Sequence, residues 1–485
     1  MNKIIAVIGF VIVLASCTEM IEQEPESSIG AGSFWKTEDD ANGALNGIYD
    51  RLRSVVDYEY FNWSDIRGEY YTNGLQAPEG YEYYYENRLS PTNAGTQWKE
   101  LYTVLHDCNL MLKYVDGITF NDEADKDVLK AQAYGVRAYV NFIIARTWGD
   151  APLRLDPTEG LGGDLYQKRM PVAQLFGQID LDIEAALGLV SANTISDKYY
   201  MSRPAIKALQ AEVALHKARV LKEDVTTNLD LAIAALNEVE QSSSVNLTAN
   251  YASIFEEENK RNEEIIWSIP FIDLEETGNI GDKIYVRGDQ MPPGANDTLQ
   301  GAGLSRFAYK REMCEKFAAN DPRANATFVL LLDADGEYYM SLSRKYDGKY
   351  FANEGSRKFV SDVILYRVGE IILMKAEAYL AKGEYKNAIT EMNRIRFRVN
   401  QPDYDGAETA EAVSAALLNE YMFETMGEGK RWWQMIRFGG SSVAKALIEE
   451  VAPGKYVYNS DVPMYFPLSE GTISLNPELG QTVGY

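Results

Sequence analysis

The chain has 485 residues, 46% of them hydrophobic and 25% charged, a composition typical of a chain that buries a core and one that excludes global disorder. It contains one long apolar run, near its N-terminus, which excludes a polytopic membrane protein. The 72 acidic residues against 47 basic ones give a net charge of −25. This charge excludes nucleic acid as a partner, because a phosphate backbone needs a clustered positive face.

Residues 1–16 have the pattern of a signal peptide, with a charged start at Lys3, an apolar stretch over residues 4–14 and small residues before Cys17. The apolar stretch is too short to span a bilayer. Because Cys17 directly follows small residues, the segment resembles a bacterial lipobox, whose cysteine receives lipid. An ordinary secretory signal with a chance cysteine is the alternative. We expect a lipid-anchored chain in which the acidic residues 17–32 form an extended tether.

Helical periodicity dominates the rest of the chain, and the predicted helices come in pairs. The pairs are residues 127–148 with 172–190, 203–221 with 227–240, and 361–381 with 384–399. Alanines inside the first helices of the later pairs let neighbouring helix backbones approach closely, as in tetratricopeptide-type repeats. The sequence therefore predicts a mainly α fold over residues 33–485. We expect one domain with a tetratricopeptide-like helical-repeat scaffold, an α-α superhelix.

Two long insertions interrupt this scaffold. Residues 58–98 hold 11 aromatic side chains among 41 residues, more than twice the 12% of the whole chain. Residues 242–360 contain short strand-like pieces at 265–269 and 329–332, among prolines and glycines. Irregular insertions on a rigid scaffold are where binding surfaces usually lie, so we expect the ligand there.

The aromatic side chains suggest a carbohydrate site, because Tyr and Trp offer a flat apolar face with a polar edge. We predict that aromatic rings stack on a ligand, that Asp65 and Arg67 bind its hydroxyl groups, and that Tyr285 and Arg287 form an opposite wall. The predicted stacking residues are Trp63, Tyr83, Tyr84 and Tyr85. The alternative is that these rings pack the first insertion onto the helices.

No motif points to catalysis or to a cofactor. Two histidines and three cysteines show no metal-ligand spacing, and no phosphate-binding loop occurs. His106 and His216 both lie in helical patterns, where a structural histidine is the ordinary interpretation. Many Asp/Glu pairs exist, but no motif distinguishes a glycosidase pair. We expect no catalytic residues, no metal and no cofactor, and we expect Cys108 and Cys314 to be buried thiols.

Several sequence blocks, in this order, resemble the RagB/SusD family of nutrient-uptake outer-membrane lipoproteins. Besides Cys17, they are residues 33–41 (SFWKTEDDA), 44–49 (ALNGIY), 131–139 (AQAYGVRAY), 145–153 (ARTWGDAPL), 321–323 (DPR), 366–379 (YRVGEIILMKAEAY), 427–439 (GEGKRWWQMIRFG) and 476–485 (NPELGQTVGY). Each block alone is weak, but the ordered set covers nearly the whole chain.

The resemblance implies a tetratricopeptide-like fold, anchored at the outer face of a Gram-negative outer membrane. It also implies a lid-like partnership with a SusC-like TonB-dependent barrel, to which the protein hands an oligosaccharide without cutting it. Capture of peptides, a surface glycosidase, and a purely structural role on the barrel are the alternatives. The acidic charge favours neutral or cationic ligands over polyanions. Family ligand residues vary, so the site prediction rests on the residues above.

Overall fold

The computed structural model describes residues 34–77, 79–93, 95–160, 165–273, 280–286, 288–291, 303–451, 453 and 465–485. The predicted signal peptide, Cys17, the tether to residue 32 and Arg287 lie outside these residues. No helix within the described ranges is long and apolar enough to cross a bilayer.

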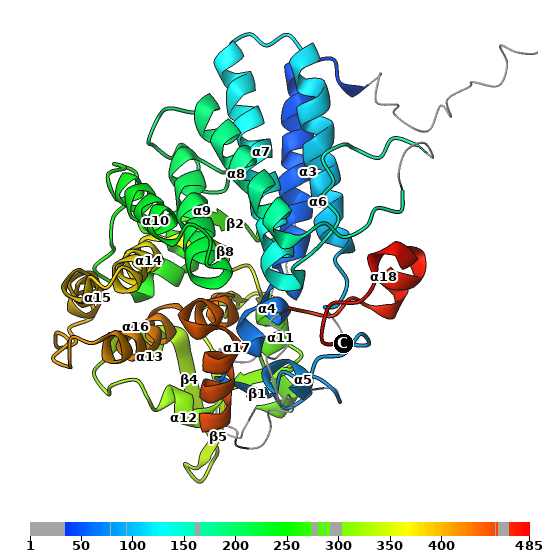
Figure 1. Cartoon of the computed structure of the whole chain (residues 1–485). Helices are drawn as coiled ribbons and strands as arrows, with labels where there is room; N and C mark the ends of the chain where they lie inside the picture. Colours follow the sequence, from blue (N-terminus) through cyan, green and yellow to red (C-terminus); the bar gives the residue numbers. More distant parts are fainter. Residues whose placement is uncertain are drawn as a thin grey trace, which may run out of the picture.

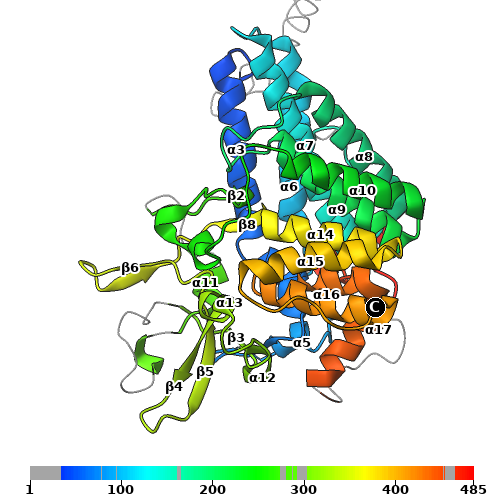
Figure 2. The ribbon, with the colours of Figure 1, turned by 90° about the vertical axis from the view of Figure 1, so that its left-hand side faces the viewer.

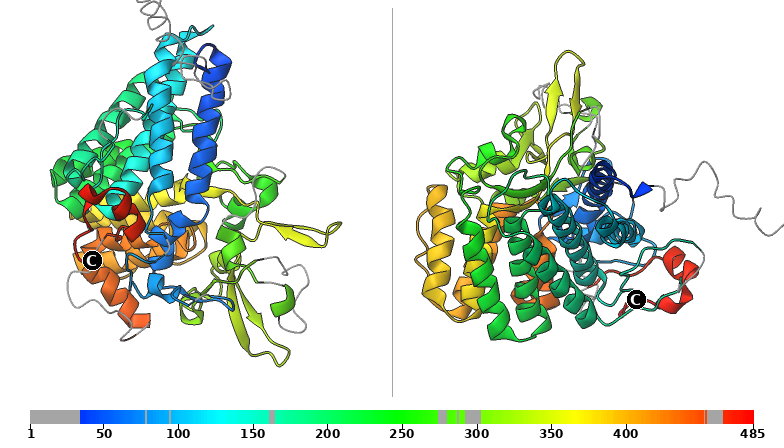
Figure 3. Two further views of the ribbon diagram at one scale, coloured as in Figure 1. Left: turned by 90° about the vertical axis from the view of Figure 1, so that its right-hand side faces the viewer. Right: turned by 90° about the horizontal axis from the view of Figure 1, so that it is seen from above.

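Helices that pack in chain order, each on the next, form the scaffold. Seen from above in Figure 3, they make a curved row. They are α3 (Glu38–Val56), α6 (Lys99–Tyr114), α7 (Glu123–Trp148), α8 (Val172–Leu189), α9 (Arg203–His216), α10 (Val225–Glu240), α14 (Val368–Ala381), α15 (Tyr385–Arg398), α16 (Ala410–Thr425) and α17 (Arg431–Val451). The predicted helix pairs are α7 with α8, α9 with α10, and α14 with α15, which confirms the mainly α repeat fold.

Small side chains set the close spacing of this row. In α9, Ala205, Ala208 and Ala211 are fully buried, and in α14 Ala376 and Ala378 are fully buried too. A methyl side chain at the contact lets two helix backbones come closer than a long side chain would allow. The alanines noted in the sequence therefore lie where the helices meet.

The predicted helix over residues 361–381 is wrong in its first part. Residues 363–367 form strand β8 (Val363–Arg367), which pairs antiparallel with β2 (Ile265–Ile269). The sequence Val-Ile-Leu-Tyr suits a fully buried strand, and β2 supplies the backbone partners that a lone strand would lack. Helix α14 begins only at Val368. The strand-like pieces predicted at 265–269 and 329–332 are confirmed as β2 and β4 (Phe328–Leu332).

The two insertions meet at a short sheet. Strand β1 (Tyr71–Asn73) of the first pairs antiparallel with β3 (Phe307–Tyr309) of the second. The remaining short elements are α4 (Glu59–Trp63), α5 (Glu82–Tyr85), α11 (Ile280–Ile284), α12 (Arg311–Cys314), α13 (Pro322–Thr327), β5 (Tyr338–Ser343), β6 (Lys349–Phe351) and β7 (Ser356–Lys358). Most lie below the helical row, and Figure 2 shows β4, β5 and β6 extending away from it. Cys108 and Cys314 are buried and unpaired.

Buried ion pairs connect the insertions to the helices. The fully buried Arg367, at the junction of β8 and α14, donates to Glu264 at 2.8 Å, to Glu424 at 2.6 Å and to Glu428 at 2.8 Å. Arg398 of α15 pairs with Glu424 as well. Such charges must be paired, because a lone buried ion costs several kcal/mol.

A second buried pair joins α7 to α9. Arg146 donates to Glu212 at 2.7 Å, and the hydroxyl of Tyr366 donates to the other oxygen of Glu212 at 2.6 Å. Burial opposes ionisation of Glu212, but Arg146, Lys430 and Arg437 more than offset it and lower its pKa to about 2. The carboxylate is therefore charged in the folded protein, and its charge stabilises the fold.

We predict that Glu212→Gln lowers the free energy of unfolding by about 3 kcal/mol at pH 7, since it leaves Arg146 without a counter-ion. The folded pKa of Glu212 lies below its ordinary value of 4.5, so the contribution of its charge is complete above that value. This contribution is lost as pH falls toward 2. Denaturant titrations across pH should therefore show the difference from the native protein narrowing in acid. Glu184→Gln, on the exposed face of α8, is the control and should match the native protein.

Candidate functional site

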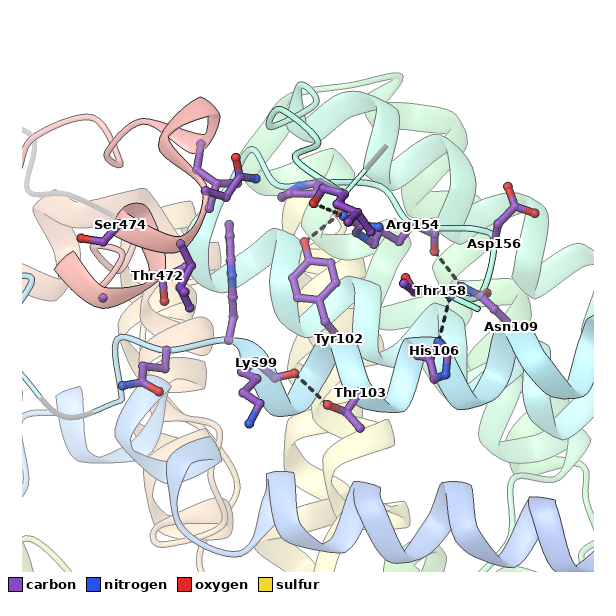
Figure 4. A pocket seen from close by; sticks show the side chains of 18 residues that line it. Lys99, Tyr102, Thr103, His106, Asn109, Arg154, Asp156, Thr158, Thr472 and Ser474 are labelled. Atoms are coloured by element: carbon purple, nitrogen blue, oxygen red, sulfur yellow. Dashed lines mark hydrogen bonds between the residues drawn. The ribbon is translucent and has the colours of Figure 1, made fainter. Parts of the chain in front are cut away.

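A cavity of about 950 Å³ lies between α6, the loop that follows α7, and the C-terminal segment that carries α18 (Glu470–Leu475). We call it the main groove. Figure 4 shows α18 on one side, the loop on the other and α6 below. Its volume falls within the range of cavities that enclose a ligand of several rings.

One face of α6 forms the floor of the main groove. Trp98, Tyr102, His106 and Asn109 follow one another at helical spacing, so they line the same face. The rings of Trp98 and Tyr102 meet edge to face, with centroids 5.4 Å apart. The side chain of Trp98 is buried, whereas those of Tyr102 and His106 are half-buried. The floor therefore combines aromatic rings with polar atoms.

The loop after α7 forms the second wall, and α6 holds it at three points. The hydroxyl of Tyr102 donates to the carbonyl oxygen of Pro152 at 2.8 Å, and Asn109 donates to that of Arg154 at 3.1 Å. The backbone N–H of Thr158 donates to Nδ1 of His106 at 3.1 Å. Burial raises the pKa of Tyr102, which keeps its hydroxyl protonated as a donor.

Gly149 makes the turn into this loop possible. It ends α7 with φ of 73°, a conformation that favours glycine. A Cβ at this position would lie 2.9 Å from the ring of Tyr465. Beyond the turn, Ala151 and Met170 form a single antiparallel bridge that closes the base of the loop.

The C-terminal segment forms the third wall. Trp148 donates from its indole nitrogen to the carbonyl oxygen of Pro467 at 3.2 Å, and Asn476 donates to that of Gln167 at 2.9 Å. Ser469 caps α18 by accepting from the backbone N–H of Thr472 at 3.0 Å. Thr472 and Ser474 of this wall are among the residues that line the groove (Figure 4).

The lining of the main groove suits a polyhydroxylated ligand. The ring of Tyr102 offers an apolar face, while Gln97, Thr103 and the hydroxyls of α18 offer hydrogen bonds. Among the described residues that line it, Asp156 is the single carboxylate. Glycoside hydrolysis generally uses two carboxyl groups, one on either side of the bond that is cleaved.

Two smaller cavities adjoin the main groove. One, of about 340 Å³, shares Gln97 and Lys99 with it and reaches Glu59 of α4. The other, of about 680 Å³, shares His106 with it and reaches Trp35. All three hollows take lining residues from α6 or from the residues just before it.

Six of the predicted site residues lie in the interior instead. Trp63 is 2% exposed, and its indole nitrogen donates to the carbonyl oxygen of Gly95 at 2.7 Å. The others are Asp65, Arg67, Tyr84, Tyr85 and Tyr285, all at most 8% exposed. A side chain without accessible surface cannot stack on a ligand, so burial argues against direct contact for these six. Tyr83 keeps a partly exposed ring, with Arg88 over one face, and Arg287 lies outside the described residues.

Asp65 and Arg67 have structural partners. Asp65 accepts hydrogen bonds from the hydroxyls of Tyr70 at 2.6 Å and Tyr71 at 3.0 Å, and from the backbone N–H of Lys430 at 3.1 Å. The guanidinium of Arg67 lies 3.5 Å from the ring centre of Trp432. These contacts attach the first insertion to the segment that begins α17.

The structure also separates the two predicted walls. Tyr285 is buried beneath Phe359 and Arg357, within the second insertion. It therefore does not face Tyr83 across a cavity that the structure describes. The insertions meet instead through β1 and β3, and through a hydrogen bond of 2.7 Å from Arg306 to the hydroxyl of Tyr81.

The sequence interpretation missed Tyr102 and assigned no ligand role to Trp98 and His106. A signal was present, because Trp98, Tyr102 and His106 recur every four residues on one helix. Such a stripe is also typical of a core-facing helix, and only the positions of the loop and of α18 show that it lines a cavity. No comparable pattern in the local sequence indicates that residues 471–479 line the groove.

Comparisons with known proteins agree with this fold. Two family models match the chain: the SusD family over residues 332–485, and a family described as starch-binding associating with outer membrane over residues 48–215. SusD-like protein P38 of Formosa agariphila is 26% identical, and the match covers 98% of this chain and 96% of that protein.

Solved structures are similar over nearly the whole chain. NanU of B. fragilis has a TM-score of 0.84 at 26% identity, with 95% of this chain and 99% of NanU covered. A laminarin binding SusD-like protein has a TM-score of 0.77 at 20% identity, with 93% and 100% covered. The second likeness is one of fold alone.

We predict opposite outcomes for two aromatic residues of the first insertion. Trp63→Ala should lower the free energy of unfolding by about 3–5 kcal/mol, because it empties a buried site. Tyr83→Ala should change it by less than about 1 kcal/mol, because that ring is partly exposed. Chemical denaturation measures both values. A Trp63→Ala protein as stable as the native one would contradict the interior position of this ring.

Proposed function

This chain belongs to the SusD family, and we propose that it is a cell-surface lipoprotein that captures an oligosaccharide and passes it uncleaved to a SusC-like TonB-dependent outer-membrane transporter. The family model for residues 48–215 associates its members with the outer membrane and with starch, and one structural relative is described as binding laminarin. Both ligands are neutral glucose polymers.

The main groove is the observation that carries this proposal. It offers aromatic rings on a floor that α6 fixes, hydroxyl and amide groups on its walls, and one carboxylate among its described lining residues. A sugar ring needs an apolar face to stack on and hydrogen-bond partners at its edge, and the groove has both. The same lining lacks the paired carboxylates of a glycosidase, which supports capture without cleavage.

Membrane attachment is part of the proposal. We assign residues 1–16 to a lipoprotein signal peptide, Cys17 to lipidation and residues 17–32 to an acidic tether, with one domain over 33–485. Lipid on Cys17 would hold this domain at the outer surface of the outer membrane, next to the barrel that receives the ligand. The proposal also takes the protein to need no metal and no cofactor.

Calorimetric titration of the soluble domain tests the proposal. The ligand panel comprises laminari-oligosaccharides, malto-oligosaccharides, uronic acid oligosaccharides and a peptide mixture. We expect saturable binding of a neutral oligosaccharide, and chromatography should recover the sugar uncut. Binding of peptides alone would favour the peptide-capturing alternative, and release of shorter sugars would favour a glycosidase.

We predict that Tyr102→Leu weakens binding of that oligosaccharide about tenfold, equivalent to ~1.4 kcal/mol, because it removes the aromatic face. Tyr102→Phe keeps the ring and should retain most of the affinity, which separates stacking from the hydrogen bond to Pro152. Tyr385→Leu, on α15 away from the groove, is the matched control. Equal affinity of Tyr102→Leu and the native protein would show that the ligand binds elsewhere.

A further inference from the structure

The smaller cavity at Glu59 has features that the main groove does not. It lies between the start of α4, the chain before α6 and the first turn of α6, and it has a volume of about 340 Å³. Gln97 and Lys99 line both hollows, so the side cavity is a direct neighbour of the main groove. We call it the side cavity.

Glu59 is an unusual carboxylate for this protein. Within the described residues it forms no ion pair, and its side-chain hydrogen bond comes from the amide of Asn62 at 3.2 Å. Burial raises its pKa, with the Asn62 hydrogen bond acting in the opposite direction. The buried Glu69 and Glu370 are paired with Arg431 and Lys430, and the buried Asp65 accepts several hydrogen bonds. Within the same described ranges, the half-buried Glu59 has neither a paired cation nor several donors. Glu59 thus retains acceptor capacity that the fold does not use.

Glu59 lines the side cavity, whereas its neighbour Asn62 is fully buried and does not. The carboxylate of Glu59 is therefore the group that a ligand in this cavity would meet. Gly95 keeps the space beside Glu59 open, since a Cβ there would lie 2.7 Å from its carboxylate. A hydroxyl-bearing ligand in this cavity can use the acceptor capacity of Glu59 that the fold leaves unused.

We propose that the side cavity binds the end of an uncharged oligosaccharide whose other units lie in the main groove. In this proposal, which rests on the proposed function, Glu59 accepts hydrogen bonds from the hydroxyls of the terminal sugar. A carboxylate has two oxygens, so it can accept from two neighbouring hydroxyls of one sugar ring. Hydrogen bonds to a charged acceptor are roughly twice as strong as neutral ones.

The charge of the side cavity restricts the ligand further. Glu59 and Glu100 both line it, against one cation, Lys99. A sugar acid in this small space would place its carboxylate beside two others and would be repelled. The sugar at this end of the ligand is therefore neutral. The side cavity thus restricts the class of glycan more narrowly than the lining of the main groove does.

Comparison of a long and a short ligand tests this inference. The hexasaccharides and disaccharides of the laminarin and starch series are titrated into the native protein, Glu59→Gln and Glu184→Gln. We expect Glu59→Gln to weaken binding of the hexasaccharide about tenfold, because a charged acceptor is lost, and to leave the disaccharide unchanged. Glu184→Gln, which replaces an exposed glutamate on α8, should match the native protein.

A second variant tests the same inference without changing Glu59, so it controls for indirect effects of the Glu59→Gln substitution. Gln97 is exposed where the two hollows join, so Gln97→Trp should block the passage without disturbing the core. It should also reduce the preference for the hexasaccharide. If both variants bind the hexasaccharide as the native protein does, the inference is overturned while the proposed function stands. If the native protein binds no oligosaccharide of either series or of the wider panel, the proposed function fails, and this inference with it.

Discussion

The buried guanidinium of Arg367 is the contact on which the arrangement of the two halves of the molecule depends. Its three glutamate partners come from the approach to β2, from α16 and from the turn before α17, so one side chain joins segments far apart in the sequence. Burial is the largest effect on its pKa and lowers it, yet Glu428 and Glu424 more than compensate and hold the pKa well above its usual range. Each of these buried charges would be costly without its partners, so the ion pairs hold the helical row and the second insertion to one another.

The same logic explains why the most family-like sequence blocks contribute few residues to the lining of the main groove. Residues 366–379 and 427–439 supply Arg367, Glu370, Glu428 and Lys430, all of which pair inside the protein. The block 476–485 supplies Asn476, which fixes the position of a groove wall. These blocks thus mainly build the scaffold, and most residues that line the main groove lie on the segments between them.

The fold was largely predictable because helix pairs with alanine contacts leave a periodic pattern in the local sequence. Strand β8 was not, since the apolar residues 363–367 suit a strand or a buried helix, and only pairing with β2 decides between them. The site was predicted less well for a physical reason: the Tyr and Trp side chains that suit a sugar also fill a core. Nothing local distinguishes the buried Trp63 from Tyr102, because the difference lies in which distant segment covers each ring.

The walls of the main groove differ in how firmly they are attached. The floor belongs to a buried helix and the loop is bonded to it, but α18 buries none of its side chains, and Leu475 is 79% exposed. Segments with few buried contacts open at a lower free energy than the core. Amide hydrogens of α18 should accordingly exchange with solvent well before those of α6. The groove can thus widen on one side while the scaffold stays folded, so entry and release of a long chain need not be slowed by unfolding of the domain.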